Sequence, residues 1–143
     1  MATALDVDDR IWLTRSYGPS QLEQRVARVL DRVGARYRTQ APFYPYAVDF
    51  LISWDTAGSK RHYLALEVDG CTVHGCATCG YDHVMRDKRA QDSRRDFALL
   101  WRYGLRLVHV WGHDLRTDKQ ALATITRLLT ARGYPTDQKE AAV

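Results

Sequence analysis

The fold of this chain is decided by one stretch of sequence, Tyr63-Leu64-Ala65-Leu66-Glu67-Val68-Asp69-Gly70-Cys71-Thr72-Val73-His74-Gly75-Cys76-Ala77-Thr78-Cys79. It begins with an apolar run, residues 63–66, which is typical of a buried strand. Two carboxylates, Glu67 and Asp69, stand where that strand ends, and all three cysteines of the chain follow. Carboxylate oxygens suit a hard cation such as Mg²⁺, whereas clustered thiolates with a histidine suit Zn²⁺. The stretch therefore predicts a strand that leads into a loop with two kinds of metal chemistry.

The length and composition predict a single globular domain. The chain has 143 residues, of which 45% are hydrophobic and 27% are charged. We expect one domain over residues 1–143, with a core over about 20–132 and a flexible tail over about 135–143. No apolar run approaches the ~20 residues that a membrane span needs. The N-terminus is acidic and lacks the pattern of a signal peptide, so we expect a cytoplasmic protein with no membrane contact.

The cysteines and the net charge constrain the partners. Three cysteines bunched together cannot form a balanced set of disulfides, and metal binding is the better interpretation in a reducing compartment. The formal net charge of +4 permits contact with phosphates without requiring it.

Hydrophobic periodicity predicts alternating helices and strands. The expected elements are a helix over 20–33, a short strand over 36–40, a break over 42–45, a strand over 47–54, its hairpin partner over 61–68, a helix over 85–103, a strand over 105–111 and a helix over 118–132. In the helix over 85–103 we expect four residues to face inward, namely Ala90, Phe97, Leu100 and Trp101.

This order of elements predicts an α/β sandwich with a central mixed sheet flanked by helices. The last strand follows a long crossover, so it should pair in parallel with a neighbour. Asp49 lies on one strand of the hairpin and Glu67 at the end of the other. The two carboxylates can therefore converge at one edge of the sheet.

These residues resemble a known family. Asp49 followed by Glu67-Val68-Asp69 resembles the active-site core of the PD-(D/E)XK nuclease superfamily. The fuller pattern is similar to the very-short-patch-repair endonucleases. It comprises Val68-Asp69-Gly70-Cys71-x-x-His74-x-Cys76, then Arg94-Arg95-Asp96, then Gly104-Leu105-Arg106-Leu107-Val108-His109-Val110-Trp111. The resemblance covers about residues 20 to 115 and implies a restriction-endonuclease-like sandwich.

The resemblance implies a catalytic magnesium site. Asp49 would ligate Mg²⁺ by its side chain and Val68 by its main-chain carbonyl, while Glu67 stands where the superfamily has its second acidic ligand. Glu23 matches the acidic residue that such enzymes place on the first helix. Asp69 stands where the superfamily usually has a lysine, which removes one candidate for activating water.

The resemblance also implies a structural zinc site. Cys71 and Cys76 match two ligand positions, Cys79 lies close to a third, and His113 falls where the family has its distant ligand. His74 matches the histidine that these enzymes use near the scissile phosphate. From the residues alone, His74 could instead complete a local zinc knuckle or lie on the surface.

Two positions distinguish this chain from the endonucleases of mismatch repair. The repair enzymes carry aromatic residues between the first cysteine and the histidine, where this chain has Thr72 and Val73. Neither side chain can stack on a base. We therefore expect the nuclease core without T:G mismatch specificity.

Structural roles are also open for several acidic residues. Glu23 lies three residues after Ser20, which makes a capping box. Asp49 is costly in a strand unless it is solvated, paired or bound to a metal. Glu67 and Asp69 could be charges at the rim of the sheet. We interpreted His62, His83 and His109 as structural or exposed.

A basic face on the helix over 85–103 could follow a phosphate backbone. Its residues are Arg86, Lys88, Arg89, Arg94 and Arg95. Acidic residues are interleaved with these basic ones, so an ordinary salt-bridged helix surface is nearly as good an interpretation.

The residues and the resemblance together predict a Mg²⁺-dependent DNA endonuclease or nickase stabilised by Zn²⁺. The alternatives are a non-catalytic zinc-containing nucleic-acid-binding module and a nuclease subunit that needs a protein partner or a second copy.

Overall fold

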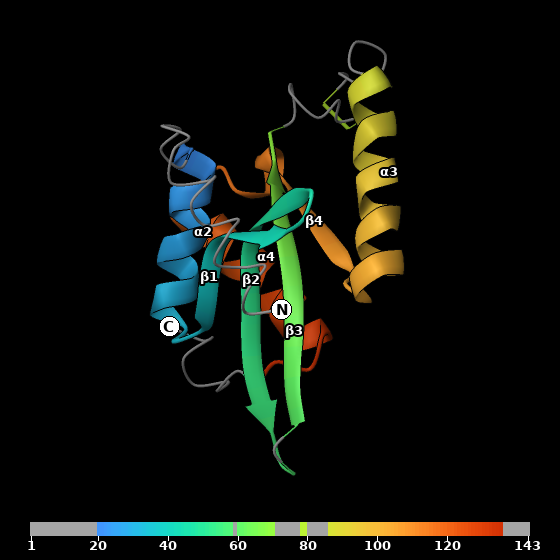
Figure 1. Cartoon of the computed structure of the whole chain (residues 1–143). Coiled ribbons are helices and arrows are strands. Elements are labelled where there is room, and N and C mark those ends of the chain that lie inside the picture. The colour runs from blue at the N-terminus through green and yellow to red at the C-terminus, as the bar shows by residue number, and fades with distance from the viewer. Residues whose placement is uncertain (1–19, 59, 71–77, 80–85, 136–143) are drawn as a thin grey trace.

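The computed structural model describes residues 20–58, 60–70, 78–79 and 86–135 (Figure 1). They form an α/β fold with a four-stranded mixed sheet and three helices. In chain order the elements are α2 (Gln21–Arg32), β1 (Arg36–Phe43), β2 (Tyr46–Thr56), β3 (Lys60–Asp69), α3 (Arg86–Tyr103), β4 (Leu107–Trp111), the short 3-10 helix η1 (Gly112–Asp114) and α4 (Asp118–Ala131). The cysteine loop lies mostly outside the described residues.

The sheet has the strand order β1-β2-β3-β4. The first three strands form an antiparallel meander, and β4 pairs in parallel with β3. The predicted parallel pairing of the last strand is thereby confirmed. In the register of the sheet, Phe50 on β2 faces Leu66 on β3, and Glu67 on β3 faces His109 on β4. The carboxylates of β2 and β3 and the histidine of β4 consequently meet at one end of the sheet.

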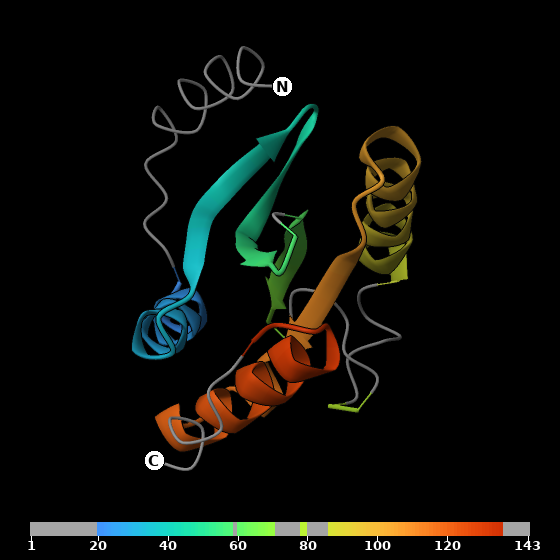
Figure 2. The ribbon, with the colours of Figure 1, turned by 90° about the horizontal axis from the view of Figure 1, so that it is seen from below.

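Helices α2 and α4 cover one face of the sheet (Figure 2). The apolar stripes of these two helices pack against alternate residues of β2 and β3, which is what the alternation of residues 47–54 predicted. The main members of this core are Val26, Leu30, Phe50, Ile52, Leu66, Ile125 and Leu129. At the rim, the Arg25 guanidinium donates to Asp118 at 2.9 Å and ties α2 to the start of α4.

Helix α3 lies on the other side of the sheet and packs through a smaller core (Figures 1 and 2). This core comprises Ala41, Phe43, Val48, Ala65, Leu99, Leu105 and Leu107. The prediction that Ala90, Phe97, Leu100 and Trp101 face inward was wrong, because all four are exposed and the buried residue of this turn is Leu99. Three charged side chains of α3, namely Asp92, Arg95 and Asp96, turn towards the sheet instead.

Several predicted boundaries also shift. The strand expected over 36–40 continues to Phe43, because its pairing with β2 persists through Pro42. The last strand begins at Leu107 and not at residue 105. Within the described part of the chain, no helix is long and apolar enough to cross a membrane. The expected tail over 135–143 lies outside the described residues, apart from Pro135.

Candidate active site

Asp49 and Glu67 are brought together by the β2–β3 hairpin. The Asp49 backbone N–H donates to Glu67 Oε2 at 3.1 Å, and the Val68 backbone N–H donates to Asp49 Oδ2 at 2.8 Å. Each carboxylate therefore accepts a backbone hydrogen bond from the strand that carries the other. The predicted convergence of these two side chains is confirmed, but they meet on the two inner strands and not at an edge of the sheet.

Glu23 joins this pair through a glutamine. The Gln40 side-chain amide lies 3.3 Å from Glu23 Oε2 and 3.2 Å from Asp49 Oδ1, and it donates to both. Gln40 has a φ of 47° within β1, a conformation that is uncommon for a residue with a side chain. The Glu23 backbone N–H also bonds the Ser20 hydroxyl at 3.1 Å, so the capping interpretation is correct as well. Glu23 both begins α2 and contacts the carboxylate cluster.

Arg95 of α3 reaches the same cluster from the other side. Its guanidinium donates to Glu67 Oε1 at 3.0 Å, and the two side chains are only 15% and 9% exposed. Asp92 and Asp96, on the same helix, lie 3.9 Å and 3.7 Å from this guanidinium. The polar side of α3 thus faces the sheet because it carries the cation that balances Glu67.

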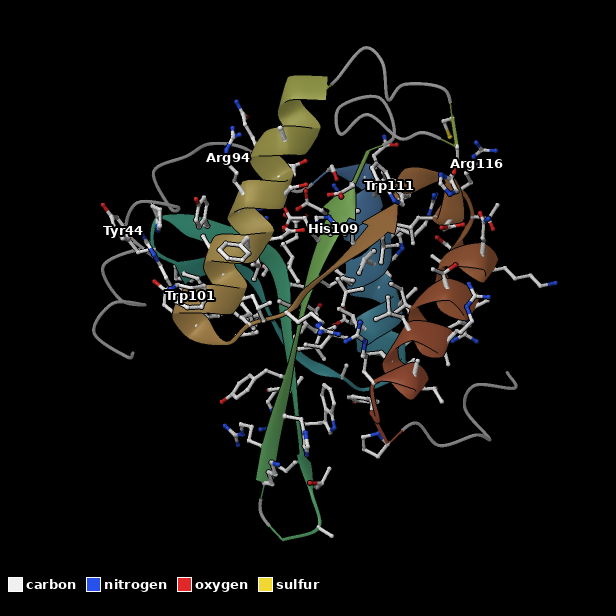
Figure 3. The ribbon with its side chains drawn as sticks, turned by 90° about the vertical axis from the view of Figure 1, so that its right-hand side faces the viewer. Tyr44, Arg94, Trp101, His109, Trp111 and Arg116 are labelled. Atoms are coloured by element: carbon white, nitrogen blue, oxygen red, sulfur yellow. The ribbon has the colours of Figure 1, made fainter. Side chains whose placement is uncertain are left out.

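Asp69 belongs to an adjoining bridge. The imidazole of His109 has Nδ1 at 2.5 Å from Asp69 Oδ2 and Nε2 at 2.5 Å from Asp96 Oδ2, which links β3, β4 and α3. Asp69 is almost fully buried, so the alternative of a rim charge was wrong for this residue. Glu67 is buried too, at 7% exposure. His109, labelled beside α3 in Figure 3, is the central residue of this bridge.

Burial and mutual repulsion control protonation in the cluster. Burial and the charge of Asp49 raise the pKa of Glu67 to about 8, although Arg95 opposes the shift. Burial also raises the pKa of Asp49 against its hydrogen bonds, and burial and Asp49 raise the pKa of Glu23. Burial lowers the pKa of His109, but the hydrogen bonds to Asp69 and Asp96 outweigh it and raise that pKa to about 10. The carboxylates resist ionisation, while His109 is held as a cation.

The donor set at Asp49 and Glu67 suits a hard divalent cation. Each carboxylate accepts two of the hydrogen bonds described above, out of about four that its oxygens can accept. Burial, and to a lesser extent the charges of neighbouring acids, raise the pKa of both groups, and a bound cation would favour their charged forms. Among the described residues, no three His, Cys, Asp or Glu side chains form a complete metal cage. Two carboxylates are nevertheless enough for Mg²⁺, which keeps several waters and takes further ligands from a substrate phosphate.

The described part of the predicted zinc site contains two residues. Cys79 Sγ and His113 Nδ1 lie 3.6 Å apart, although their positions are separated by 34 residues. This separation suits two ligands of one tetrahedral Zn²⁺, whose Zn–S and Zn–N bonds are about 2.3 and 2.1 Å. Cys71, Cys76 and His74 lie outside the described residues. The role of His74 therefore stays a prediction.

Two residues of the predicted basic face, Arg94 and Arg95, lie on different sides of α3. Arg94 is exposed on α3 (Figure 3), whereas Arg95 is only 15% exposed and contacts Glu67 of the carboxylate cluster. The side chains of Arg86, Lys88 and Arg89 lie outside the described part of the structure.

Sequence reasoning missed Gln40 and the bridging role of His109. Gln40 lies in a short polar strand with no motif around it. The only local signal is that this strand stands between the helix that carries Glu23 and the strand that carries Asp49. His109 alternates with apolar residues on β4, which suggested a structural residue. Its bridge follows from the parallel register with β3, which places it beside Glu67.

Comparison with models of protein families, with curated proteins and with solved structures gave no match to this chain.

Proposed function

We propose that this chain is a Mg²⁺-dependent endonuclease or nickase that hydrolyses phosphodiester bonds in DNA. The observation that carries the proposal is the pair of partly buried Asp49 and buried Glu67, joined by reciprocal backbone hydrogen bonds and contacted by Arg95. A pair of desolvated carboxylates with raised pKa values is typical of a functional site. These are the two residues that the sequence resemblance proposes as ligands of the catalytic ion.

The fold supports a restriction-endonuclease-like sandwich. A mixed sheet flanked by helices on both sides is the architecture that the resemblance implies. The order of one helix, a three-stranded meander, a second helix and a parallel strand agrees with it. The three elements β2, β3 and α3 each contribute a charged group to the cluster, namely Asp49, Glu67 and Arg95.

The side chains of the cluster have complementary roles in this proposal. A bound Mg²⁺ would supply Lewis-acid polarisation of the phosphate and orient a water molecule. Asp49, Glu67 and the Val68 carbonyl would hold the ion, and Gln40 fixes the orientation of Asp49 by its hydrogen bond. Arg95 places a guanidinium beside Glu67, where it can balance negative charge that develops on the phosphate. Glu23 shares Gln40 with Asp49 and so belongs to the support of the site.

We infer that zinc fixes the loop that follows β3. Cys79 and His113 would join that loop to η1, together with Cys71 and Cys76. A structural Zn²⁺ can supply much of the folding free energy of a small domain. The predicted His74, as general base or charge stabiliser, would be carried on this loop. We propose no T:G mismatch specificity for this chain, because Thr72 and Val73 cannot stack on a base.

Incubation of the zinc-loaded protein with supercoiled plasmid tests the proposal. We expect relaxed or linear DNA when Mg²⁺ is present and intact plasmid when Mg²⁺ is omitted. Asp49→Asn in the presence of Mg²⁺ is the matched control and should leave the plasmid intact. Cleavage that Asp49→Asn does not reduce would refute the assignment of the site. Tight DNA binding without cleavage would favour a non-catalytic module, and inactivity on all DNA substrates would favour a subunit that needs a partner.

A further inference from the structure

The outer side of α3 carries an aromatic surface that the catalytic cluster does not use. Phe97 and Trp101 are 68% and 81% exposed, and Leu100 between them is 48% exposed. The rings of Phe97 and Trp101 lie nearly parallel, with centroids 6.3 Å apart and planes 8° apart. We call Phe97, Leu100, Trp101 and Tyr44 the α3 aromatic surface.

This surface is built into the fold at its edge. The Tyr103 hydroxyl donates to the Tyr44 carbonyl at 2.6 Å, and the Tyr103 ring packs edge-on against Phe43. The turn that carries Tyr44 is thereby held against the end of α3. Figure 3 shows Tyr44, Arg94 and Trp101 on one side of this helix, with His109 on the other. The aromatic rings are therefore held in place without being part of a core.

The charges beside the α3 aromatic surface are basic. Among the described side chains of α3, Arg94 and Arg102 are exposed. The two acids of this helix that the structure describes, Asp92 and Asp96, lie towards Arg95 and His109 on the inner side. A second copy of the chain would bring its own arginines against these, and like charges disfavour such pairing. Exposed aromatic rings beside arginines instead complement a strand that has both bases and phosphates.

We propose that the α3 aromatic surface binds single-stranded DNA, with bases stacked on Trp101 and Phe97 and phosphates on Arg94 and Arg102. This inference deepens the proposed function and rests on DNA being the ligand. Helix α3 carries the α3 aromatic surface and also Arg95, which contacts Glu67, so a DNA strand bound along this helix would lie close to the cluster. The aromatic residues of α3 then supply the stacking that Thr72 and Val73 cannot provide.

Binding of a fluorescein-labelled oligothymidylate, without added Mg²⁺, tests the proposal. All proteins would carry Asp49→Asn, so that no cleavage disturbs the measurement. Fluorescence anisotropy should show that Trp101→Ala weakens binding by about tenfold or more, as the loss of one base–aromatic stack does. Phe97→Ala should act in the same direction, and Arg94→Gln should reduce the dependence of binding on salt.

Tyr63→Ala is the matched control. Tyr63 is also an exposed aromatic residue, at 54% exposure, but it lies on β3 and not on α3. Its removal should leave oligothymidylate binding unchanged. Equal binding by Trp101→Ala and the parent protein would overturn the proposal. So would a Trp101→Ala protein that binds DNA normally but sediments as a smaller species, since this surface would then join two copies.

The same variants separate this proposal from the proposed function. Plasmid cleavage is measured separately in the presence of Mg²⁺, on the wild-type protein and on Asp49→Asn alone. If Trp101→Ala loses oligothymidylate binding while Asp49→Asn alone retains plasmid cleavage, the aromatic surface stands and the assigned active site fails. If Asp49→Asn abolishes cleavage while Trp101→Ala binds oligothymidylate normally, the active site stands and the aromatic surface fails.

Discussion

Asp49 is the residue whose environment is hardest to explain by packing alone. It lies on β2 between the buried residues Val48 and Phe50, and burial raises its pKa. Two hydrogen bonds, from Val68 and Gln40, hold its carboxylate in one orientation. A partly buried carboxylate next to Glu67 reduces stability unless something else is gained. The proposed gain is a site for a divalent cation.

The substitution Asp49→Asn separates that role from stability. The asparagine oxygen can accept from the Val68 N–H, whereas its amide cannot accept from Gln40, which continues to donate to Glu23, so one hydrogen bond is lost. We therefore expect a change in the free energy of unfolding of about 1 kcal/mol or less. The melting temperature can rise, because repulsion with Glu67 is removed. Plasmid cleavage should fall by about 100-fold or more, because the anionic ligand is lost. An unfolded Asp49→Asn protein would show that this carboxylate is required structurally.

His109 is the second residue with a defined charge state. Its imidazole bridges Asp69 and Asp96, and removing it leaves two acids without this partner. We expect His109→Gln to lower the free energy of unfolding at neutral pH by about 1–3 kcal/mol. Urea denaturation followed by circular dichroism measures this change. A variant as stable as the wild type at pH 7 would show that the bridge contributes nothing net.

The pH dependence of this effect has a definite sign. The pKa of His109 is raised from 6.5 to about 10, so its contribution is fully present below pH 6.5 and is lost as the pH rises through 10. The pKa of Glu67 is raised to about 8, so its contribution to stability also falls as the pH rises, but it is already lost once the pH has passed about 8. Wild-type protein should therefore lose stability between pH 8 and 10, whereas His109→Gln should lose much less. Parallel curves for the two proteins across this window would contradict the assignment.

At the scale of elements, the β2–β3 hairpin could be predicted from sequence and α3 only in part. Alternation of apolar residues defined β2, and the register that follows brings Asp49 to Glu67. The orientation of α3 could not be predicted, because apolar side chains occur on both of its sides. Leu99 packs on the sheet, while the apolar residues Phe97 and Trp101 lie outside. The helix is oriented by Arg95 meeting Glu67, which is a contact between distant parts of the chain.

Single positions of the candidate site show the same limit. Asp49 and Glu67 could be found because an acid in an apolar strand is costly and therefore informative. Gln40 and His109 could not, because their roles arise from neighbours on other strands. Local sequence patterns show the hydrophobic periodicity of a helix or strand and which of its residues are buried. They show little about which polar side chains meet across a sheet.

The loop after β3 and the short helix η1 should be joined by zinc. His113→Ala removes the predicted distant ligand, which lies 3.6 Å from Cys79, and should lose both zinc and thermal stability. His74→Ala should retain one zinc per chain and lose only cleavage. Elemental analysis and differential scanning fluorimetry measure the two properties. His62→Ala is a control for zinc content, because His62 stacks on Trp54 in another part of the fold. The reverse pattern for His113 and His74 would indicate a local knuckle.

On the scale of the whole molecule, the sheet separates two cores with different roles. The larger core, under α2 and α4, contains most of the buried side chains. The smaller one holds α3 against the sheet mainly through Leu99, and α3 in turn positions Arg95 and Asp96. Damage to the larger core should therefore affect stability, whereas damage to the smaller core should also affect the site.

Leu99→Ala and Leu129→Ala test this division with the same change in two places. Both leucines are fully buried, so each substitution should lower the free energy of unfolding by about 2–5 kcal/mol. Leu99→Ala should in addition loosen α3, so that Arg95 no longer holds its place beside Glu67, and cleavage should fall at a temperature where the protein is still folded. Leu129→Ala should cleave plasmid at the wild-type rate under the same conditions, because α4 contributes no group to the described cluster. Circular dichroism confirms folding before each cleavage assay. Equal loss of cleavage in both variants would mean that the cluster depends on overall stability and not on the position of α3.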